Sequence, residues 1–275
     1  MYKFFLFFLF ASLLCGILTA QVTENVFIAV IDGTRYSETF GDSLHRFVPV
    51  MWNKLKPIGA FYTSFYNEGV TKTVPGHTSI LTGTLQTVIN NGGERPTMPT
   101  LFEYYRKQKN TQIASCYVVL GKDKLNALTY SIHEKYGPDY CASIKKSIKD
   151  SDDCRTFENI KEVVSESHPR LLVANFGGVD IAGHYDKFVN YTSKIKIADS
   201  LMGELWNYIQ SDSTYKNKTT LMITNDHGRH LDSVGGGYHT HGDGCEGCRH
   251  ISLLVLGPDT PSGVIDTTMT EQIDI

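Results

Sequence analysis

The chain has 275 residues, of which 41% are hydrophobic and 20% are charged. This balance is typical of a globular protein and excludes a disordered, collagen-like or coiled-coil chain. Lysine and arginine number 26 against 29 aspartates and glutamates, a formal net charge of −3. The sequence therefore lacks the basic excess of a protein that binds nucleic-acid duplexes.

The first twenty residues predict a secretory signal peptide. Lys3 gives a basic start, residues 4–18 form an apolar run, and Thr19 and Ala20 offer a small-residue cleavage site before Gln21. About 15 apolar residues are short for an uncleaved anchor helix, which needs about 20. We therefore expect a secreted protein without a stable membrane span, with residues 21–275 forming a single domain.

Short apolar runs rich in β-branched residues follow, bounded by Gly, Asp and Asn as in strands buried on both faces of a parallel sheet. They are residues 26–31, 113–120, 171–176, 220–224 and 251–256. Helical patterns lie at residues 100–109, 157–165 and 191–210. The alternation predicts an α/β fold, doubly wound, with a mostly parallel central sheet and helices on both faces. Residues 121–170 are long for a crossover and are expected to carry an insert or a lid over the site.

Three of these runs are followed by an aspartate, at Asp32, Asp180 and Asp226. Ligand sites in open parallel sheets form outside the carboxyl ends of the strands, so we expect the three carboxylates to meet at one rim. Helix capping is the alternative role for each of them. His184 follows Asp180 by four residues and His227 follows Asp226 directly.

More histidines follow, among them His239 and His241. Carboxylate and imidazole groups together suit Zn²⁺ or a similar divalent ion. The sequence thus holds enough ligands for two metal ions.

A candidate nucleophile is Thr73, within the segment of residues 72–77 that reads Lys-Thr-Val-Pro-Gly-His. Thr73 suits an N-cap and Pro75 a first helical turn, and a plain helix cap is the alternative interpretation. Beside two divalent ions, its hydroxyl would have a lowered pKa and could attack phosphorus. Asn90 or Asn91 could add a donor to the substrate, although their Asn-Asn-Gly-Gly run is also typical of a turn.

Five cysteines remain after the predicted cleavage. Cys116 lies in an apolar run and is expected to be a buried small side chain. Cys245 and Cys248 form a Cys-x-x-Cys, compatible with a disulfide, a redox pair or half of a zinc site that would need histidine partners. In a secreted chain we expect the disulfide.

Taken in chain order, these motifs resemble the alkaline phosphatase superfamily from about residue 24 to the C-terminus. They are Asp32, Lys72-Thr73-Val74-Pro75-Gly76-His77, Asp180-x-x-x-His184, Asp226-His227-Gly228 and a late histidine. The threonine within Lys-Thr-x-Pro-x-His resembles the type I phosphodiesterase/nucleotide pyrophosphatase branch. The sulfatase branch fits less well, because its modifiable Cys or Ser and its Arg are absent from residues 73–77.

The resemblance implies two divalent ions, usually Zn²⁺ and in some branches Mn²⁺. One ion would take Asp180, His184 and His241, which we prefer to His239 as the late ligand. The other would take Asp32, Thr73, Asp226 and His227.

The activity implied is hydrolysis of small phosphate esters, diesters or monoesters, through a phospho-threonine intermediate. The alternatives are a phosphoryl transferase or mutase of the same fold, and an inactive metal-binding ectodomain. Lys122 and Lys124 could reach the substrate, but lysines in such a segment are more often solvated, so we expect them at the surface.

Overall fold

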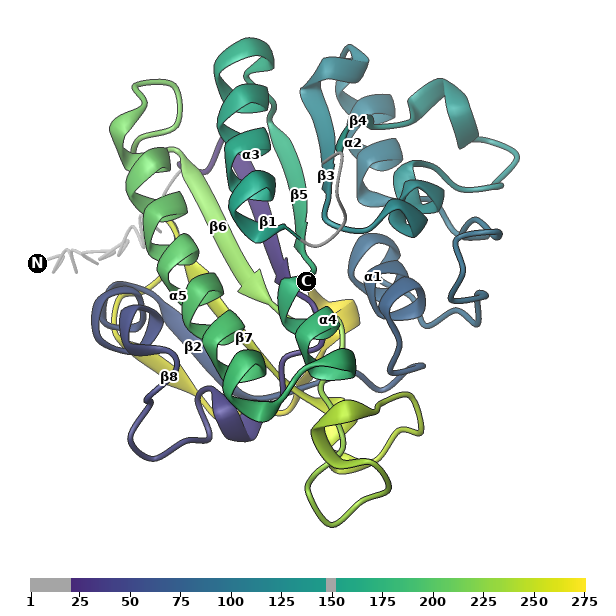
Figure 1. The fold of residues 1–275 in the computed structure, drawn as a ribbon. Helices are drawn as coiled ribbons and strands as arrows, with labels where there is room; N and C mark the ends of the chain where they lie inside the picture. Colours follow the sequence, from purple (N-terminus) through teal and green to yellow (C-terminus); the bar gives the residue numbers. More distant parts are fainter. Residues whose placement is uncertain (1–20, 147–151) are drawn as a thin grey trace, which may run out of the picture.

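The computed structural model describes residues 21–146 and 152–275 (Figure 1). The signal peptide predicted at residues 1–20 lies outside the described residues. Within the two described ranges, none of the helices combines the length and the apolar character needed to cross a bilayer.

A mixed sheet forms the centre of the molecule, with the strand order β4-β3-β5-β1-β6-β7-β2-β8 and with β9 paired to β2. Its strands are β1 (Asn25–Ile31), β2 (Ala60–Tyr66), β3 (Cys116–Leu120), β4 (Ser143–Lys146), β5 (Leu171–Phe176), β6 (Thr219–Thr224), β7 (His250–Leu256), β8 (Val264–Asp266) and β9 (Thr270–Glu271). The strands from β4 to β6 are parallel, and β7 runs antiparallel to both β6 and β2. The predicted α/β class with a mostly parallel sheet is confirmed.

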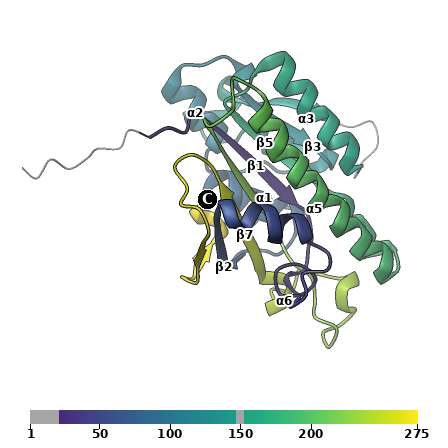
Figure 2. The same ribbon diagram turned by 90° about the vertical axis from the view of Figure 1, so that its left-hand side faces the viewer.

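Helices cover both faces of this sheet (Figure 2). They are α1 (Thr73–Thr82), α2 (Leu101–Lys109), α3 (Asp153–Ser167), α4 (Gly178–Tyr185), α5 (Phe188–Ser211) and the short α6 (Glu246–Arg249). Alternate residues of β1 point to opposite faces: Phe27 and Ile31 pack in one cluster with α3 and α5, whereas Ile28 and Val30 pack in another with α1 and α2. Both faces of β1 are therefore buried, which explains the apolar run at residues 26–31.

The predicted strands correspond to β1, β3, β5, β6 and β7. β5 has the predicted bounds, β1, β6 and β7 each begin one residue earlier, and β3 begins three residues later. Residues Ile113–Ser115 form a 3₁₀ turn, so that β3 begins only at Cys116. The described residues of the segment 121–170 contain two 3₁₀ stretches, the edge strand β4 and helix α3. Within this segment β4 extends the sheet and α3 adds to its helical cover, and the first residues of the segment lie at the carboxyl end of β3.

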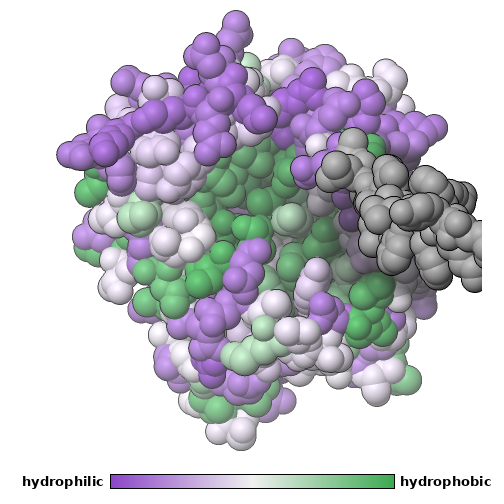
Figure 3. Space-filling model, turned by 180° about the vertical axis from the view of Figure 1, so that it is seen from behind, coloured by the Kyte–Doolittle hydropathy of each residue, from purple (hydrophilic) through white to green (hydrophobic). Residues whose placement is uncertain are grey.

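The face away from α3 and α5 is less fully covered. Seen from that side, apolar side chains gather in a hollow with hydrophilic side chains around it (Figure 3). The small cluster on β2 and β7 includes the partly buried Tyr62, Met222 and Val255. The chemistry-bearing residues are elsewhere, at the rim formed by the carboxyl ends of the parallel strands.

Candidate metal centre

The three aspartates predicted to converge lie at the ends of three neighbouring strands. Asp32 follows β1, Asp180 is in the first turn of α4 directly after β5, and Asp226 lies two residues after β6. All three are buried. Two glycines allow this approach: a Cβ on Gly33 would lie 2.6 Å from Asp180 Oδ1, and one on Gly76 would lie 2.4 Å from the Asp226 carbonyl oxygen.

The first ligand group consists of Asp32, Asp226 and His227. Nε2 of His227 lies 3.6 Å from Asp32 Oδ1 and 3.5 Å from Asp226 Oδ2. Ligands at about 2.0–2.1 Å around a tetrahedral Zn²⁺ are about 3.3–3.4 Å apart, close to these distances. All three of these atoms are buried and have no hydrogen-bond partner. Because unpartnered buried polar atoms are costly, three converging lone pairs fit a cation.

Neighbouring groups fix the orientation of these ligands. Asp226 Oδ1 accepts backbone N–H bonds from Gly33 (3.0 Å) and His227 (2.9 Å), which leaves Oδ2 for a metal. Nδ1 of His227 lies 2.9 Å from the Gly228 carbonyl oxygen. Since a carbonyl only accepts, Nδ1 carries the proton and Nε2 presents a lone pair.

The second group consists of Asp180, His184 and His241. Asp180 Oδ1 lies 3.4 Å from His184 Nε2 and 3.6 Å from His241 Nε2, and the two Nε2 atoms are 3.0 Å apart. Nδ1 of His184 donates to the His239 carbonyl and Nδ1 of His241 donates to the Thr71 carbonyl, each over 2.9 Å. Both Nε2 atoms are therefore acceptors that face each other, an arrangement that a cation between them would stabilise.

The structure brings His241, and not His239, to this group. The ring of His239 turns away and bonds the Gly183 carbonyl over 2.9 Å. The His241 ring stacks on His227 with 3.9 Å between centroids, which links the two groups. Burial and the neighbouring His227 lower the pKa of His241 to about 2, so its imidazole is neutral and able to bind metal across the working pH range.

Thr73 is the first residue of α1, and Lys72, rather than Thr73, occupies the N-cap position. The backbone N–H groups of residues 74–76 are not free to bind an anion at this helix start. The Val74 N–H donates to Asn90 Oδ1 (2.9 Å), Pro75 has no N–H, and the Gly76 N–H donates to the Lys72 carbonyl. The cation beside Thr73 is instead Lys122.

The expectation that Lys122 lies on the surface is wrong. This side chain is buried, and its Nζ lies 2.9 Å from Asp32 Oδ2, 2.5 Å from Asp180 Oδ2 and 3.5 Å from Thr73 Oγ1. Lys124 is half-buried and its Nζ donates to Asn90 Oδ1 over 3.3 Å. The sequence does contain a signal for Lys122, since it lies two residues after β3 and hence at the same rim as the aspartates.

Arg229 is a second buried cation that the sequence analysis missed. Its guanidinium contacts the Asp180 carboxylate and donates to the carbonyls of Asp180 (2.7 Å), Gly33 (2.9 Å) and Tyr238 (2.9 Å). Burial opposes ionisation of Asp180, but Lys122 and Arg229 outweigh it and hold the pKa of Asp180 well below its usual range. Burial and the nearby Asp226 raise the pKa of Asp32.

His77 and Asn175 connect Thr73 to the aspartates. His77 Nδ1 donates to the Thr73 carbonyl over 2.9 Å and lies 3.3 Å from Asp226 Oδ2. Asn175 Nδ2 donates to Asp32 Oδ2 (2.9 Å) and to His77 Nε2 (3.1 Å). These contacts hold the start of α1 against the rim.

The remaining predicted residues lie outside the two ligand groups. Asn90 lies beside the start of α1, where its side-chain oxygen accepts the Val74 N–H. Asn91 is exposed, and its side chain accepts the Gly93 N–H over 2.8 Å, as in a turn. Cys245 and Cys248 are free thiols in this structure, so the predicted disulfide between them is not formed.

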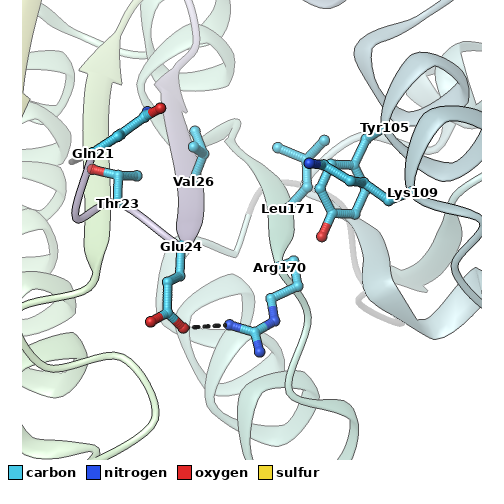
Figure 4. A pocket seen from close by; sticks show the side chains of 8 residues that line it. All are labelled: Gln21, Thr23, Glu24, Val26, Tyr105, Lys109, Arg170 and Leu171. Atoms are coloured by element: carbon cyan, nitrogen blue, oxygen red, sulfur yellow. Dashed lines mark hydrogen bonds and ion pairs between the residues drawn. The ribbon is translucent and has the colours of Figure 1, made fainter. Parts of the chain in front are cut away.

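Two cavities are candidates for the place where a substrate binds. One, of about 340 Å³, borders the rim and is lined by Lys122, Asp123, Lys124, Asp180, Ile181, His184 and Tyr185. Another, of about 500 Å³, lies at the opposite ends of β1 and β5, beside the Glu24–Arg170 ion pair (3.1 Å; Figure 4). None of the described residues that line the second cavity is a histidine or a cysteine, so we assign the chemistry to the first.

Comparisons with known proteins show the family and the fold of this chain. The model of the Metalloenzyme superfamily matches residues 76–243, more than half of the chain. The match includes Asp180, His184 and the segment from Asp226 to His241, while Asp32 and Thr73 precede it. No curated protein matches the sequence.

Solved structures share the fold at low sequence identity. They include a protein of the alkaline phosphatase superfamily from Vibrio parahaemolyticus (14% identity, 92% of this chain and 64% of that one, TM-score 0.65). The lipoteichoic acid synthase LtaP from Listeria monocytogenes is also similar (12%, 92% and 70%, TM-score 0.65). So is murine ectonucleotide pyrophosphatase/phosphodiesterase 5 (14%, 91% and 92%, TM-score 0.61).

The chain spans less than two thirds of the Vibrio protein. Sulfatases are also among the similar structures, so the fold by itself leaves the reaction open. On the family match and the shared fold, the chain belongs to the Metalloenzyme superfamily and has the α/β fold of the alkaline phosphatase superfamily.

Proposed function

We propose that the protein is a secreted, metal-dependent phosphohydrolase of the phosphodiesterase/nucleotide pyrophosphatase type, and that Thr73 is its nucleophile. The observation that carries the proposal is the set of three unpartnered buried atoms, on Asp32, Asp226 and His227. The buried Thr73 hydroxyl is linked to this set through Lys122, which contacts both Thr73 and Asp32. Zn²⁺ suits these nitrogen and oxygen donors, and so does Mn²⁺.

Electrostatics favour an anionic substrate. Lys122 and Arg229 balance two of the three buried rim carboxylates. Two divalent ions would reverse the remaining negative charge and make the rim strongly positive. A phosphate ester would then enter an attractive field.

The ions, when bound, would lower the pKa of the Thr73 hydroxyl and stabilise the charge that develops on the attacking and leaving oxygens. Thr73 Oγ1 loses its proton to solvent and attacks phosphorus in line with the ester oxygen. The bond from phosphorus to that oxygen breaks, the alcohol leaves with a proton from solvent, and a phospho-threonine forms. Lys122, 3.5 Å from Thr73 Oγ1, donates to the phosphoryl oxygens throughout. Attack by water from the opposite side then releases phosphate or a phosphate monoester and restores the threonine.

Two further residues position this nucleophile. His77 donates to the Thr73 carbonyl and so holds the first turn of α1. Asn90 uses its side-chain oxygen for the Val74 N–H, and its amide N–H group is the part that would reach a substrate oxygen. We propose that Asn90 contacts the substrate through this amide group, as the sequence suggested.

The test compares Thr73→Ala and Thr73→Ser in the metal-loaded enzyme. With a chromogenic phosphodiester and a matched monoester, Thr73→Ala should abolish turnover and Thr73→Ser should retain part of it. Rapid quenching followed by mass spectrometry should find a phosphoryl group on Thr73. Turnover by Thr73→Ala would refute the nucleophile, binding of phosphate without turnover would indicate an inactive ectodomain, and a need for an acceptor alcohol would indicate a transferase.

A further inference from the structure

A third group of metal-ligating side chains lies outside the rim, in the loop between β6 and β7. This loop is the yellow-green segment below α4 in Figure 1. It brings together His230, Asp243, Cys245 and Cys248, with one potential ligand atom of each lying within 4.8 Å of the others. Ligands around a tetrahedral zinc with thiolates at about 2.3 Å and N or O at about 2.0–2.1 Å lie about 3.3–3.8 Å apart, so the cluster has the right size.

The backbone of α6 places the two sulfur atoms on one side. Cys245 is the N-cap of α6, and its carbonyl accepts the N–H groups of Cys248 (2.9 Å) and Arg249 (3.0 Å). Residues three apart in such a turn lie on the same face. Cys248 is fully buried, Cys245 is half-buried, and both are free thiols.

His230 points an unpartnered nitrogen at this group. The residue is 8% exposed, and its Nε2 is buried without a hydrogen-bond partner. Nδ1 lies 2.6 Å from the Gly235 carbonyl oxygen, so Nδ1 carries the proton and Nε2 presents a lone pair. This Nε2 is 3.0 Å from Asp243 Oδ1 but does not form a hydrogen bond with it. A lone pair facing a carboxylate is repulsive unless a cation lies between them.

A backbone N–H group orients one of the acidic ligands. The Asp243 carboxylate accepts the Cys245 N–H over 3.0 Å. Binding would release the thiol protons to solvent and leave thiolate ligands.

We propose that His230, Asp243, Cys245 and Cys248 bind a structural Zn²⁺ that closes the β6–β7 loop. Two sulfur donors, one imidazole and one carboxylate form a closed tetrahedral set with no position for substrate. The loop also carries His227 and His241, one ligand from each group at the rim. The zinc would thus tie together the part of the loop that positions them, and it would do so whether or not the rim catalyses phosphoester hydrolysis.

Cobalt substitution tests this site separately, because no sulfur ligand belongs to the rim groups. The full purified chain is first assayed for disulfides, then reduced, stripped of metal and titrated with Co²⁺. We expect a thiolate-to-cobalt charge-transfer absorption that Zn²⁺ abolishes by displacing Co²⁺. Cys245→Ser with Cys248→Ser should remove the absorption, whereas the exposed control Cys154→Ser and the rim variant Asp226→Asn should keep it.

Asp243→Ala is a second variant for the case that the double serine variant does not fold. Asp243 is exposed, so its replacement should leave the fold intact. It should weaken Zn²⁺ binding at this site by about 10- to 100-fold, while circular dichroism stays that of the unaltered chain. A Cys245–Cys248 disulfide in the chain as isolated would overturn the proposal. So would the absence of the absorption when both thiols are shown to be reduced, or its persistence in the double serine variant.

Discussion

Replacing Lys122 with methionine tests the role of the buried cation beside Thr73. Methionine keeps a long side chain but removes the charge, which lies 3.5 Å from Thr73 Oγ1. A phosphoryl oxygen about 4 Å from Nζ gains about 4 kcal/mol at an effective dielectric constant of about 20. Allowing for partial screening, we expect kcat/KM for a phosphodiester to fall by about 10²- to 10³-fold, the range found when one transition-state donor is removed.

The size of the expected loss depends on the charge of the substrate. A monoester dianion carries one more negative charge than a diester, so it should lose about tenfold more activity than the diester. The assay measures kcat/KM for a matched pair of substrates at saturating metal, so that any change in metal affinity does not contribute. Lys124→Met is the control and should lose at most about fivefold, as expected for a partly solvated charge. Equal losses for the two lysine variants, or an unchanged ratio of monoester to diester activity, would refute the reasoning.

Three further predictions concern other parts of the site and the core. Arg229→Leu should lower the free energy of unfolding by about 3–5 kcal/mol in urea titrations, because Asp180 loses a buried partner; a change below about 1 kcal/mol would contradict this. His241→Ala should weaken binding of one metal ion in calorimetry while His239→Ala should not, and the reverse order would reassign the late ligand. Burial raises the pKa of Asp199 to about 6 from an unfolded value near 3.8, so its contribution to stability is complete below pH 3.8 and is lost as the pH rises through 6. In the metal-free, unaltered chain, the free energy of unfolding should therefore fall between about pH 4 and pH 7.5, and about 3 kcal/mol of this fall should be absent in Asp199→Asn. An identical pH dependence of the two proteins would count against this pKa.

The central strands could be predicted because each is buried on both faces. Residues 171–176 read as one apolar run, and β5 has those bounds in the structure. β2 (Ala60–Tyr66) was missed because polar residues interrupt its aromatic side chains, and the edge strand β4 (Ser143–Lys146) because it is short and ends in two lysines. Edge strands carry little of the burial pattern on which such a prediction depends.

The acidic rim could be predicted from the ends of the strands, and of the two buried cations only Lys122 has such a strand-end signal. Three aspartates directly after strands had to meet once those strands were parallel neighbours. Which side chains neutralise them depends on how the loops return to the rim. Lys122 reaches Asp32 and Asp180 from the turn after β3, and Arg229 reaches Asp180 from the β6–β7 loop. Neither contact corresponds to a spacing in the sequence.

The cysteine cluster shows the same limit. The Cys-x-x-Cys was visible in the sequence, and so was the need for a histidine partner. His230 lies 15 residues before Cys245, and its buried Nε2 lone pair becomes evident only when the fold of the loop is known.

The central claim is that two divalent ions bind at the rim beside Thr73. Anomalous diffraction at the zinc edge, from crystals of the Zn²⁺-loaded chain, tests it most directly. The account predicts one peak among Asp32, Asp226, His227 and Thr73 Oγ1, and a second among Asp180, His184 and His241. A rim without peaks at full zinc loading, or with peaks remote from Thr73, would contradict it.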